Sequence, residues 1–260
     1  IFGVRDWLAK IFGLKRQNVR VIDKFVGVGL GSKGSPWSHV ALAAAAAKAV
    51  RRPVKLVVPR LQMASLTGHR PVTQQDIQLG CDDKGALTAI EHKVLSETCR
   101  FDEFVEPSAM QTRMIYSCPN VTTSHRVVRL DISTPTFTRA PGEASGTYAL
   151  ESAMDELAYA AGIDPLALRI KNYSTMDEQE KKPFSSKELM QCYTRGATAF
   201  GWSKRNPAPR SMRDGTWLVG WGLATATYPA RQLPASARVT INADGTANVQ
   251  VGTQDLGTGT

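Results

Sequence analysis

An arginine stands at the start of a turn in the segment Thr138 to Gly146, which leads into a strongly helical pattern. Pro141 and Gly142 favour a tight turn at this point. An arginine side chain and the free N–H groups of a helix N-terminus can hold an oxyanion together. The alternative is structural, with Glu143 complementing the helix dipole and pairing with Arg139 at the surface. The residue types alone leave both interpretations open.

Two further glycine-rich segments have the composition of ligand-contacting loops. Gly27 to Gly34 follows a strand-like run and precedes a helix, so its glycines permit positive φ and a close approach of a ligand to the backbone. Its spacing matches neither a dinucleotide fingerprint nor a P-loop, because Ser32 replaces the third glycine and Lys33 does not follow a glycine. Gln254 to Thr260 places polar side chains between glycines. A tight turn without a ligand is the alternative for each segment.

Metal-ligand and nucleophile patterns are not found in the sequence. The four cysteines show no C-x-x-C spacing, which favours reduced structural thiols over a zinc knuckle or a redox dithiol. They are Cys81, Cys99, Cys118 and Cys192. The four histidines stand in unrelated contexts, so no Ser-His-Asp arrangement can be proposed from them. We therefore expect no metal held directly by protein side chains.

The composition is that of an ordinary globular chain. Of its 260 residues 42% are hydrophobic and 21% are charged, and the net charge is +9. The basic residues are scattered and no zinc-finger or RNA-binding signature is present, so we expect no nucleic-acid partner. The longest apolar run, Val40 to Val50, is too short to span a bilayer. The chain starts at Ile1 and stops within a Gly-Thr repeat, so we interpret it as a fragment, and its compartment stays open.

Helices and strands alternate along the chain and would position these segments. The patterning predicts helices over residues 5–12, 37–50, 148–160, 165–172 and 186–200. It predicts strands over residues 19–26, 54–58, 76–81, 86–98, 121–132, 217–227, 238–242 and 247–251. The first glycine-rich segment would then lie in a strand, loop, helix, strand unit. This mixture is typical of an α+β or α/β protein.

The three segments, in this order and with these elements between them, resemble the large subunit of molybdenum hydroxylases. That family includes xanthine dehydrogenase, aldehyde oxidase and carbon monoxide dehydrogenase, and the likeness is greatest to bacterial aldehyde oxidoreductase large subunits. The matching stretches are VRVIDKFVGVGLGSK (19–33), RRPVKL (51–56), TRAPGEA (138–144), ESAMDE (151–156), DPLALRIKN (164–172) and GTQDLGTGT (252–260). The resemblance covers nearly the whole chain, and the ordered series is more specific than any single motif.

The resemblance implies a fold and a function. The fold would be α+β, with a first molybdenum-cofactor-binding domain over residues 1–186 and the start of a second over residues 187–260. The cofactor would be molybdopterin with molybdenum, or its cytosine dinucleotide form. Similar enzymes hydroxylate aldehydes or N-heterocycles with oxygen from water. They pass electrons to iron–sulfur clusters and FAD on partner subunits or domains.

Site residues follow from the resemblance position by position. Arg139 matches the arginine beside the metal, which implies a catalytic role near the oxo ligands and the substrate. The residues that match cofactor contacts are Gly29, Leu30, Gly31, Arg139, Ala140, Pro141, Gly142, Gln254, Asp255, Gly257, Thr258 and Gly259. The family's catalytic glutamate would lie beyond Thr260, so we expect the chain to be inactive alone.

The first loop departs from the family pattern Gly-Gly-Gly-Phe-Gly. Val28 replaces its second glycine and Leu30 replaces its phenylalanine. A β-branched residue resists positive φ, so strain of about 1–3 kcal/mol would follow if that position requires it. Two alternatives to a cofactor-binding subunit stay open. The departures at Val28 and Leu30 suggest a degenerate remnant that binds no cofactor, and the net charge of +9 suggests a basic module that binds nucleotides or nucleic acid.

Overall fold

A computed structural model of the protein describes residues 1–24, 26–27, 29–229 and 233–252. The chain divides into two compact units. The sheet unit consists of Pro71–Pro135 and Ala140–Tyr228. The loop unit consists of Ile1–Arg70, Thr136–Arg139 and Pro229–Thr260.

A three-stranded sheet forms the centre of the sheet unit, in the order β1-β2-β3. β1 (Thr73–Cys81) and β2 (Leu87–Cys99) are antiparallel, while β3 (Val121–Leu130) runs parallel to β2. The antiparallel pair is joined by the turn at Asp82, whose carboxylate accepts hydrogen bonds from the amides of Lys84 and Ala86. The parallel pair requires a longer connection, which contains the 3-10 helix η2 (Ser108–Arg113).

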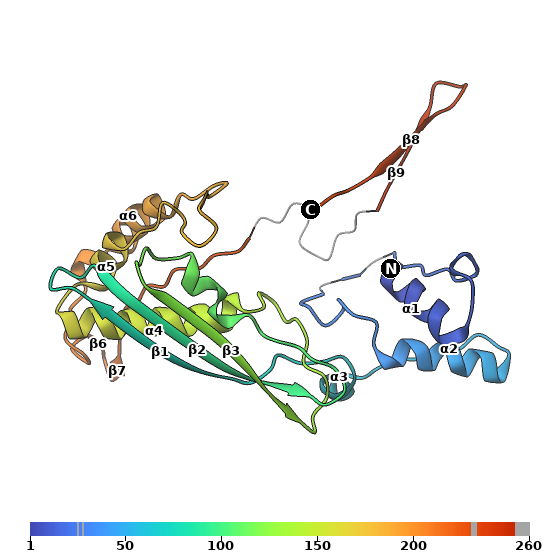
Figure 1. Ribbon diagram of the computed structural model, residues 1–260, viewed down its shortest axis with the longest axis horizontal. Coiled ribbons are helices and arrows are strands. Elements are labelled where there is room, and N and C mark those ends of the chain that lie inside the picture. The colour runs from blue at the N-terminus through green and yellow to red at the C-terminus, as the bar shows by residue number, and fades with distance from the viewer. Residues whose placement is uncertain (25, 28, 230–232, 253–260) are drawn as a thin grey trace. The chain divides into compact units, whose positions relative to one another are not determined.

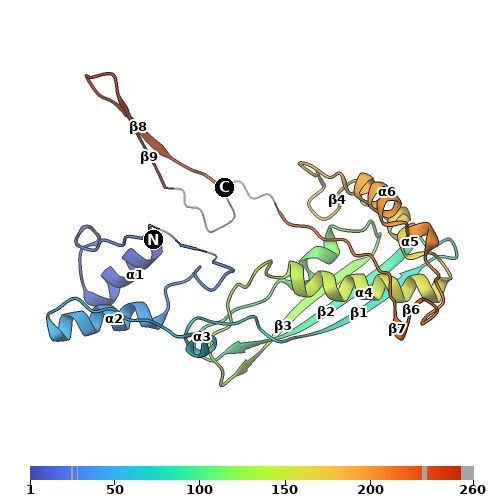
Figure 2. The same cartoon turned by 180° about the vertical axis from the view of Figure 1, so that it is seen from behind.

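Helix α4 (Glu143–Ala161) covers one face of this sheet, behind the strands in Figure 1 and in front of them in Figure 2. It ends at Gly162, which adopts the left-handed conformation with φ 65° and donates its amide to Ala158 and Tyr159. Residues four apart on the helix face the core. The core cluster contains Leu87, Ile90, Ile115, Tyr116, Cys118, Leu150, Met154, Ala158 and Leu168.

Shorter elements complete the sheet unit. The helices are α5 (Pro165–Lys171), α6 (Leu189–Phe200) and η3 (Trp202–Lys204). The two-residue strands are β4 (Met176–Asp177), β5 (Lys182–Pro183), β6 (Arg213–Asp214) and β7 (Trp217–Leu218). Asp164 caps α5 by accepting hydrogen bonds from the amides of Leu166 and Ala167. Proline at the first helical position suits this start, since its missing N–H would have no partner there.

The loop unit contains little buried apolar surface among its described residues. Its elements are α1 (Phe2–Phe12), η1 (Arg16–Asn18), α2 (Ser38–Val50), α3 (Arg60–Leu66), β8 (Ala237–Ile241) and β9 (Ala247–Val251). Ala9 is its one buried hydrophobic residue in the described part of the chain. β8 and β9 form an antiparallel ribbon whose residues are all exposed.

The mixed helix and strand content agrees with the predicted α+β class, and most elements lie where the sequence places them. Two predicted strands are wrong. The described residues of 19–26 and all of 54–58 are irregular, and Leu56 and Val57 are exposed. A strand requires a hydrogen-bonded neighbour, and no described segment pairs with either run. The predicted strand over residues 217–227 shortens to the two residues of β7.

Candidate functional site

The first glycine-rich loop turns sharply at three residues with positive φ, which are Gly27 (63°), Leu30 (48°) and Gly31 (98°). Left-handed backbone is unusual for leucine, and Leu30 is exposed. The Gly29 carbonyl accepts a hydrogen bond from Ser32 Oγ at 3.3 Å. Within the described residues, the amides of Leu30 and Gly31 have no hydrogen-bond acceptor. In the described part of the loop, these two backbone donors are therefore without a partner. Val28 lies outside the described residues.

The loop unit brings this loop against the segment that contains Arg139. The Arg139 amide donates to the Leu30 carbonyl at 2.9 Å. A Cβ on Gly31 would lie 1.9 Å from the carbonyl oxygen of Phe137, so only glycine fits there. Three of the predicted cofactor-binding residues are thus adjacent, although the first and the last are 109 positions apart along the chain. These are Leu30, Gly31 and Arg139.

The backbone of the Arg139 segment is held by a second arginine. The Arg70 guanidinium donates to the Thr138 carbonyl at 3.0 Å and to the Arg139 carbonyl at 2.5 Å. The Arg139 side chain is exposed and has no hydrogen-bond or ion-pair partner among the described residues. Its positive charge is therefore accessible, on a segment whose backbone contacts the Leu30 loop.

The other predicted residues of this segment, Ala140 to Gly142, belong to the sheet unit and precede α4. Ala140 has φ 56° and Gly142 has φ 86°, so the turn contains two left-handed residues. A Cβ on Gly142 would lie 2.6 Å from the Pro107 carbonyl. The turn is consequently pressed against the segment that enters η2.

One amide at the N-terminus of α4, that of Gly142, has a partner within the protein. Glu106 is fully buried, and its Oε1 accepts hydrogen bonds from the Gly142 amide at 2.9 Å and from Ser145 Oγ at 3.2 Å. A protein carboxylate therefore occupies the place of an external anion. Glu143 stands in the first turn of α4, as the structural alternative expects, but it is only 5% exposed rather than at the surface.

A buried polar network continues from α4 into the sheet. Ser145 Oγ lies 2.8 Å from Ser108 Oγ, and Gln75 Nε2 donates to the Ser145 carbonyl at 3.1 Å. His92 on β2 lies 3.0 Å from Gln75 Oε1 and 2.7 Å from Thr112 Oγ1. Burial, and then the charge of His125, lower the pKa of His92 to about 4. His92 is therefore neutral at pH 7 and links η2 to the sheet.

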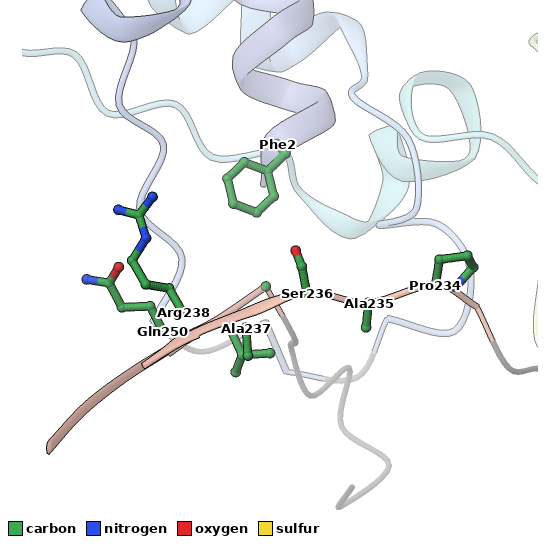
Figure 3. A pocket seen from close by; sticks show the side chains of 9 residues that line it. Phe2, Pro234, Ala235, Ser236, Ala237, Arg238 and Gln250 are labelled. Atoms are coloured by element: carbon green, nitrogen blue, oxygen red, sulfur yellow. The ribbon is translucent and has the colours of Figure 1, made fainter. Parts of the chain in front are cut away.

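The predicted residues Gln254, Asp255, Gly257, Thr258 and Gly259 lie outside the described residues. The ribbon that precedes them lines an open hollow of about 710 Å³, seen in Figure 3 with Phe2, Arg238 and Gln250 at its edge. None of the predicted site residues within the described ranges lines this hollow.

The described residues contain neither a side-chain metal centre nor a membrane-spanning helix. No group of three or more His, Cys, Asp or Glu side chains lies where it could ligate a metal ion. No described helix combines the length and the apolar character that crossing a bilayer requires.

Two residues that shape the site were not found from the sequence, namely Arg70 and Glu106. Glu106 lies 36 positions before Gly142, and Arg70 lies 69 positions before Arg139. Their only local signal is a charged residue directly before Pro71 and Pro107. That pattern predicts an extended residue rather than its distant partner.

With this geometry established, comparison with known proteins identifies the family. The sequence matches the family described as molybdopterin cofactor-binding domain over residues 1–173, and a second family of the same description over residues 195–260. The first match covers more than half of the chain, so the chain belongs to the molybdopterin cofactor-binding domain family.

Individual relatives are molybdenum-binding subunits of oxidoreductases. The chain is 40% identical over 259 residues to the aldehyde oxidoreductase molybdenum-binding subunit PaoC of Escherichia coli K12, covering 98% of this chain and 35% of that protein. It is 30% identical over 270 residues to the xanthine dehydrogenase molybdenum-binding subunit of Escherichia coli O157:H7, covering 98% of this chain and 36% of that protein. The chain thus spans about a third of the length of these relatives.

Solved structures show the same fold. The aldehyde oxidoreductase of Desulfovibrio gigas superposes with a TM-score of 0.69 at 25% identity, covering 95% of this chain and 28% of that chain. The CO dehydrogenase of Oligotropha carboxidovorans superposes with a TM-score of 0.69, covering 77% of this chain and 27% of that chain. At 22% identity, the second comparison speaks for the fold alone.

Proposed function

We propose that this chain is the cofactor-holding part of the molybdenum-binding subunit of an aldehyde-oxidising enzyme, with N-heterocycles as the alternative substrate class. The observation that carries the proposal is the hydrogen bond from the Arg139 amide to the Leu30 carbonyl. It joins two loops that are far apart in sequence, and the Arg139 side chain is exposed on one of them. The 40% identity to an aldehyde oxidoreductase subunit supports the substrate class.

The hydrogen-bond donors of the loop unit fit the proposed cofactor, molybdopterin. Molybdopterin is an anion with a phosphate, and anions are bound by arginine side chains and by backbone N–H groups without internal partners. The loop unit offers both, in the Arg139 side chain and in the amides of Leu30 and Gly31. When bound, molybdopterin with molybdenum supplies the two-electron oxidation in which water provides the oxygen atom.

The chain's own residues would orient and hold this group. Leu30 and Gly31 would present backbone N–H groups, and Arg139 would place a positive charge where oxyanions of the cofactor and substrate lie. Gly29 and the turn residues Ala140, Pro141 and Gly142 would fix the backbone around these donors. Gln254, Asp255, Gly257, Thr258 and Gly259 would bind the pterin or the cytosine dinucleotide tail.

The complete enzyme would include partners and a second domain that this chain only begins. We place the change of domain near Lys187, which is supported by family matches that end at residue 173 and resume at residue 195. Electrons would leave to iron–sulfur clusters and FAD on partner subunits. The chain spans about a third of its relatives, which supports inactivity of this chain alone.

The test is made on the complete protein that carries this sequence, purified with its partners. We expect about one molybdenum and one pterin per chain, with aldehyde-dependent reduction of an artificial acceptor. Arg139→Ala should lower kcat/KM by about 10²- to 10³-fold, the loss typical when one oxyanion donor is removed. Arg139→Lys should recover little, because an ammonium group lacks the planar donor fork.

Arg129→Ala is the matched control, because Arg129 is an exposed arginine on β3 that pairs with Glu103 at 2.7 Å. It should leave metal content and turnover unchanged. A complete protein that folds but contains neither molybdenum nor pterin would overturn the proposal in favour of a degenerate remnant. Salt-resistant retention of nucleic acid at about 0.15 M salt would favour the basic binding module instead.

A further inference from the structure

We infer that Glu106 is a positioning residue for the Ala140–Gly142 turn, acting as a hydrogen-bond acceptor of fixed reach rather than as a charge. The inference rests on the proposed function, which places this turn at the cofactor. It concerns contacts within the sheet unit only. Glu106 touches backbone and hydroxyl groups and is not assigned a part in the chemistry.

The Ala140–Gly142 turn has a backbone conformation that costs free energy. Ala140 has φ 56°, a left-handed conformation that L side chains rarely adopt. Gly142 follows at φ 86°. Residues in such conformations persist only where their surroundings hold them, and they are typical of ligand-binding turns. Some contact must therefore fix this backbone.

Glu106 makes that contact from a fully buried position. Its Oε1 accepts the Gly142 amide at 2.9 Å and Ser145 Oγ at 3.2 Å. The Glu106 backbone is held in turn, because its carbonyl accepts the Ser108 amide at 2.8 Å. Ser108 Oγ also lies 2.8 Å from Ser145 Oγ. Contacts with Ser108 therefore hold both the Glu106 backbone and Ser145, which is one of the two groups that Glu106 Oε1 accepts from.

The turn and the start of α4 lie directly against backbone of the segment around Glu106. A Cβ on Gly142 would lie 2.6 Å from the Pro107 carbonyl, and one on Gly146 would lie 1.7 Å from the Ser108 carbonyl. Backbone from both sides is therefore in direct contact. Loss of the Glu106 acceptor would leave the buried Gly142 amide without a partner, and the amide would turn toward another one.

The reach of the acceptor and its charge can be separated by substitution. Glu106→Gln keeps the length and an oxygen acceptor but removes the charge. Glu106→Asp keeps the charge but shortens the side chain by one methylene group. If Glu106 acts by reach, the glutamine variant retains function and the aspartate variant loses it. If it acts by charge, the order is reversed.

The experiment uses the complete protein with its cofactor and partners. For Glu106→Asp we expect kcat to fall about 10- to 100-fold with little change in KM, since a displacement of about 1 Å near a reacting centre has that effect. The electron paramagnetic resonance spectrum of the bound molybdenum should change as well. Glu106→Gln should stay within about 3-fold of the wild-type kcat and keep the wild-type spectrum.

Leu150→Ala is the control for stability, because Leu150 is fully buried on α4 and touches the core rather than the turn. It should lower Tm at least as much as Glu106→Asp without altering the spectrum. A wild-type protein without molybdenum would overturn the proposed function and this inference with it. Wild-type protein with molybdenum, together with an aspartate variant equal to wild type or a glutamine variant as impaired as aspartate, would overturn this inference alone.

Discussion

His92 shows how one buried side chain makes the stability of the sheet unit depend on pH. It is fully buried on β2, where desolvation and the charge of His125 lower its pKa from 6.5 to about 4. The unfolded chain binds a proton at this residue near pH 6.5, whereas the folded chain does not. The unfolding free energy is therefore full above pH 6.5 and falls as the pH drops toward 4.

The shift from 6.5 to about 4 corresponds to a loss of about 3 kcal/mol across this window. We expect denaturant unfolding of the wild type between pH 7 and pH 4 to show that loss in addition to the loss from its carboxylates. His92→Gln keeps polar contacts but does not titrate, so it should show a smaller decline. Equal pH dependence of the two proteins would contradict the prediction.

Residue-scale prediction from sequence succeeded where the signal was local. The Arg139 turn was found because proline, glycine and a helical pattern follow one another within a few positions. Glu106 was not found, because a buried carboxylate that caps a helix 36 positions away leaves no periodic trace. Its burial also contradicts the usual location of glutamate, so composition gives no help.

At the scale of elements, two glycines inside helices are expected to respond in opposite ways to alanine. A Cβ on Gly196 of α6 would meet no atom within 4 Å, whereas one on Gly146 of α4 would lie 1.7 Å from the Ser108 carbonyl. Gly196→Ala should stabilise the protein by about 0.5–1 kcal/mol, because alanine loses less backbone entropy on folding. Gly146→Ala should destabilise it by about 1–3 kcal/mol or more through overpacking.

Thermal or denaturant unfolding of the two glycine variants, measured beside the wild type, checks these two predictions. Both substitutions are chemically identical and both lie in helices, so helix propensity alone predicts the same sign for each. Stabilisation by Gly146→Ala would show that α4 and η2 do not pack as closely as the structure has them.

A buried ion pair joins α4 to α5 and to the chain near residue 225. Arg169 is fully buried and lies 2.8 Å from Glu151 Oε2, which also accepts the Thr225 amide at 2.8 Å. Burial opposes the charge of Arg169, but the adjacent Glu151 carboxylate raises its pKa overall. Arg169 also lies 2.8 Å from Asp155 Oδ1, but the Asp155 side chain is 38% exposed. Removing Glu151 would therefore leave the buried Arg169 charge with only this partly exposed partner.

Glu151→Ala should therefore lower the unfolding free energy by about 3–5 kcal/mol. Glu156→Ala, on the exposed face of the same helix, is the matched control and should change it by less than about 0.5 kcal/mol. Denaturant midpoints at constant m-value give the comparison. Similar effects of the two substitutions on the unfolding free energy would mean that the ion pair of Glu151 with Arg169 does not stabilise the fold.

Helices and hairpins were predicted well because their patterns are set by residues close in sequence. The turn at Asp82 and the α4 periodicity each lie within one short stretch. The predicted strands over 19–26 and 54–58 were wrong because apolar runs become strands only beside a partner strand. The apolar pattern predicts that Val57 is buried, but its side chain is 68% exposed in the structure.

At the scale of the whole molecule, the two units differ in how they are stabilised. All members of the core cluster belong to the sheet unit. The described part of the loop unit buries one hydrophobic residue, Ala9. Hydrophobic burial is the main favourable contribution to folding, so the sheet unit holds most of what stabilises this chain.

The β8–β9 ribbon is the clearest case of an element without its own support. Alternate residues of a strand share a face, and the register pairs Val239 with Val249 and Ile241 with Ala247. One face is therefore apolar, yet Val239 is 61% exposed and Ile241 is 79% exposed. The other face carries polar residues such as Arg238 and Gln250. An isolated two-stranded ribbon is only marginally stable in water.

Amide hydrogen exchange should consequently separate the parts of the molecule. In this chain alone, amides of β2 and α4 should exchange slowly, and those of β8 and β9 should exchange nearly as fast as in unstructured peptide. In the complete protein, where the proposed second domain continues beyond the ribbon, β8 and β9 should become protected while β2 changes little. Strong protection of the ribbon in the short chain would show that β8 and β9 form a stable structure without further sequence. Fast exchange of the ribbon in the complete protein would mean that its apolar face stays uncovered there, and would argue against a second domain built upon it.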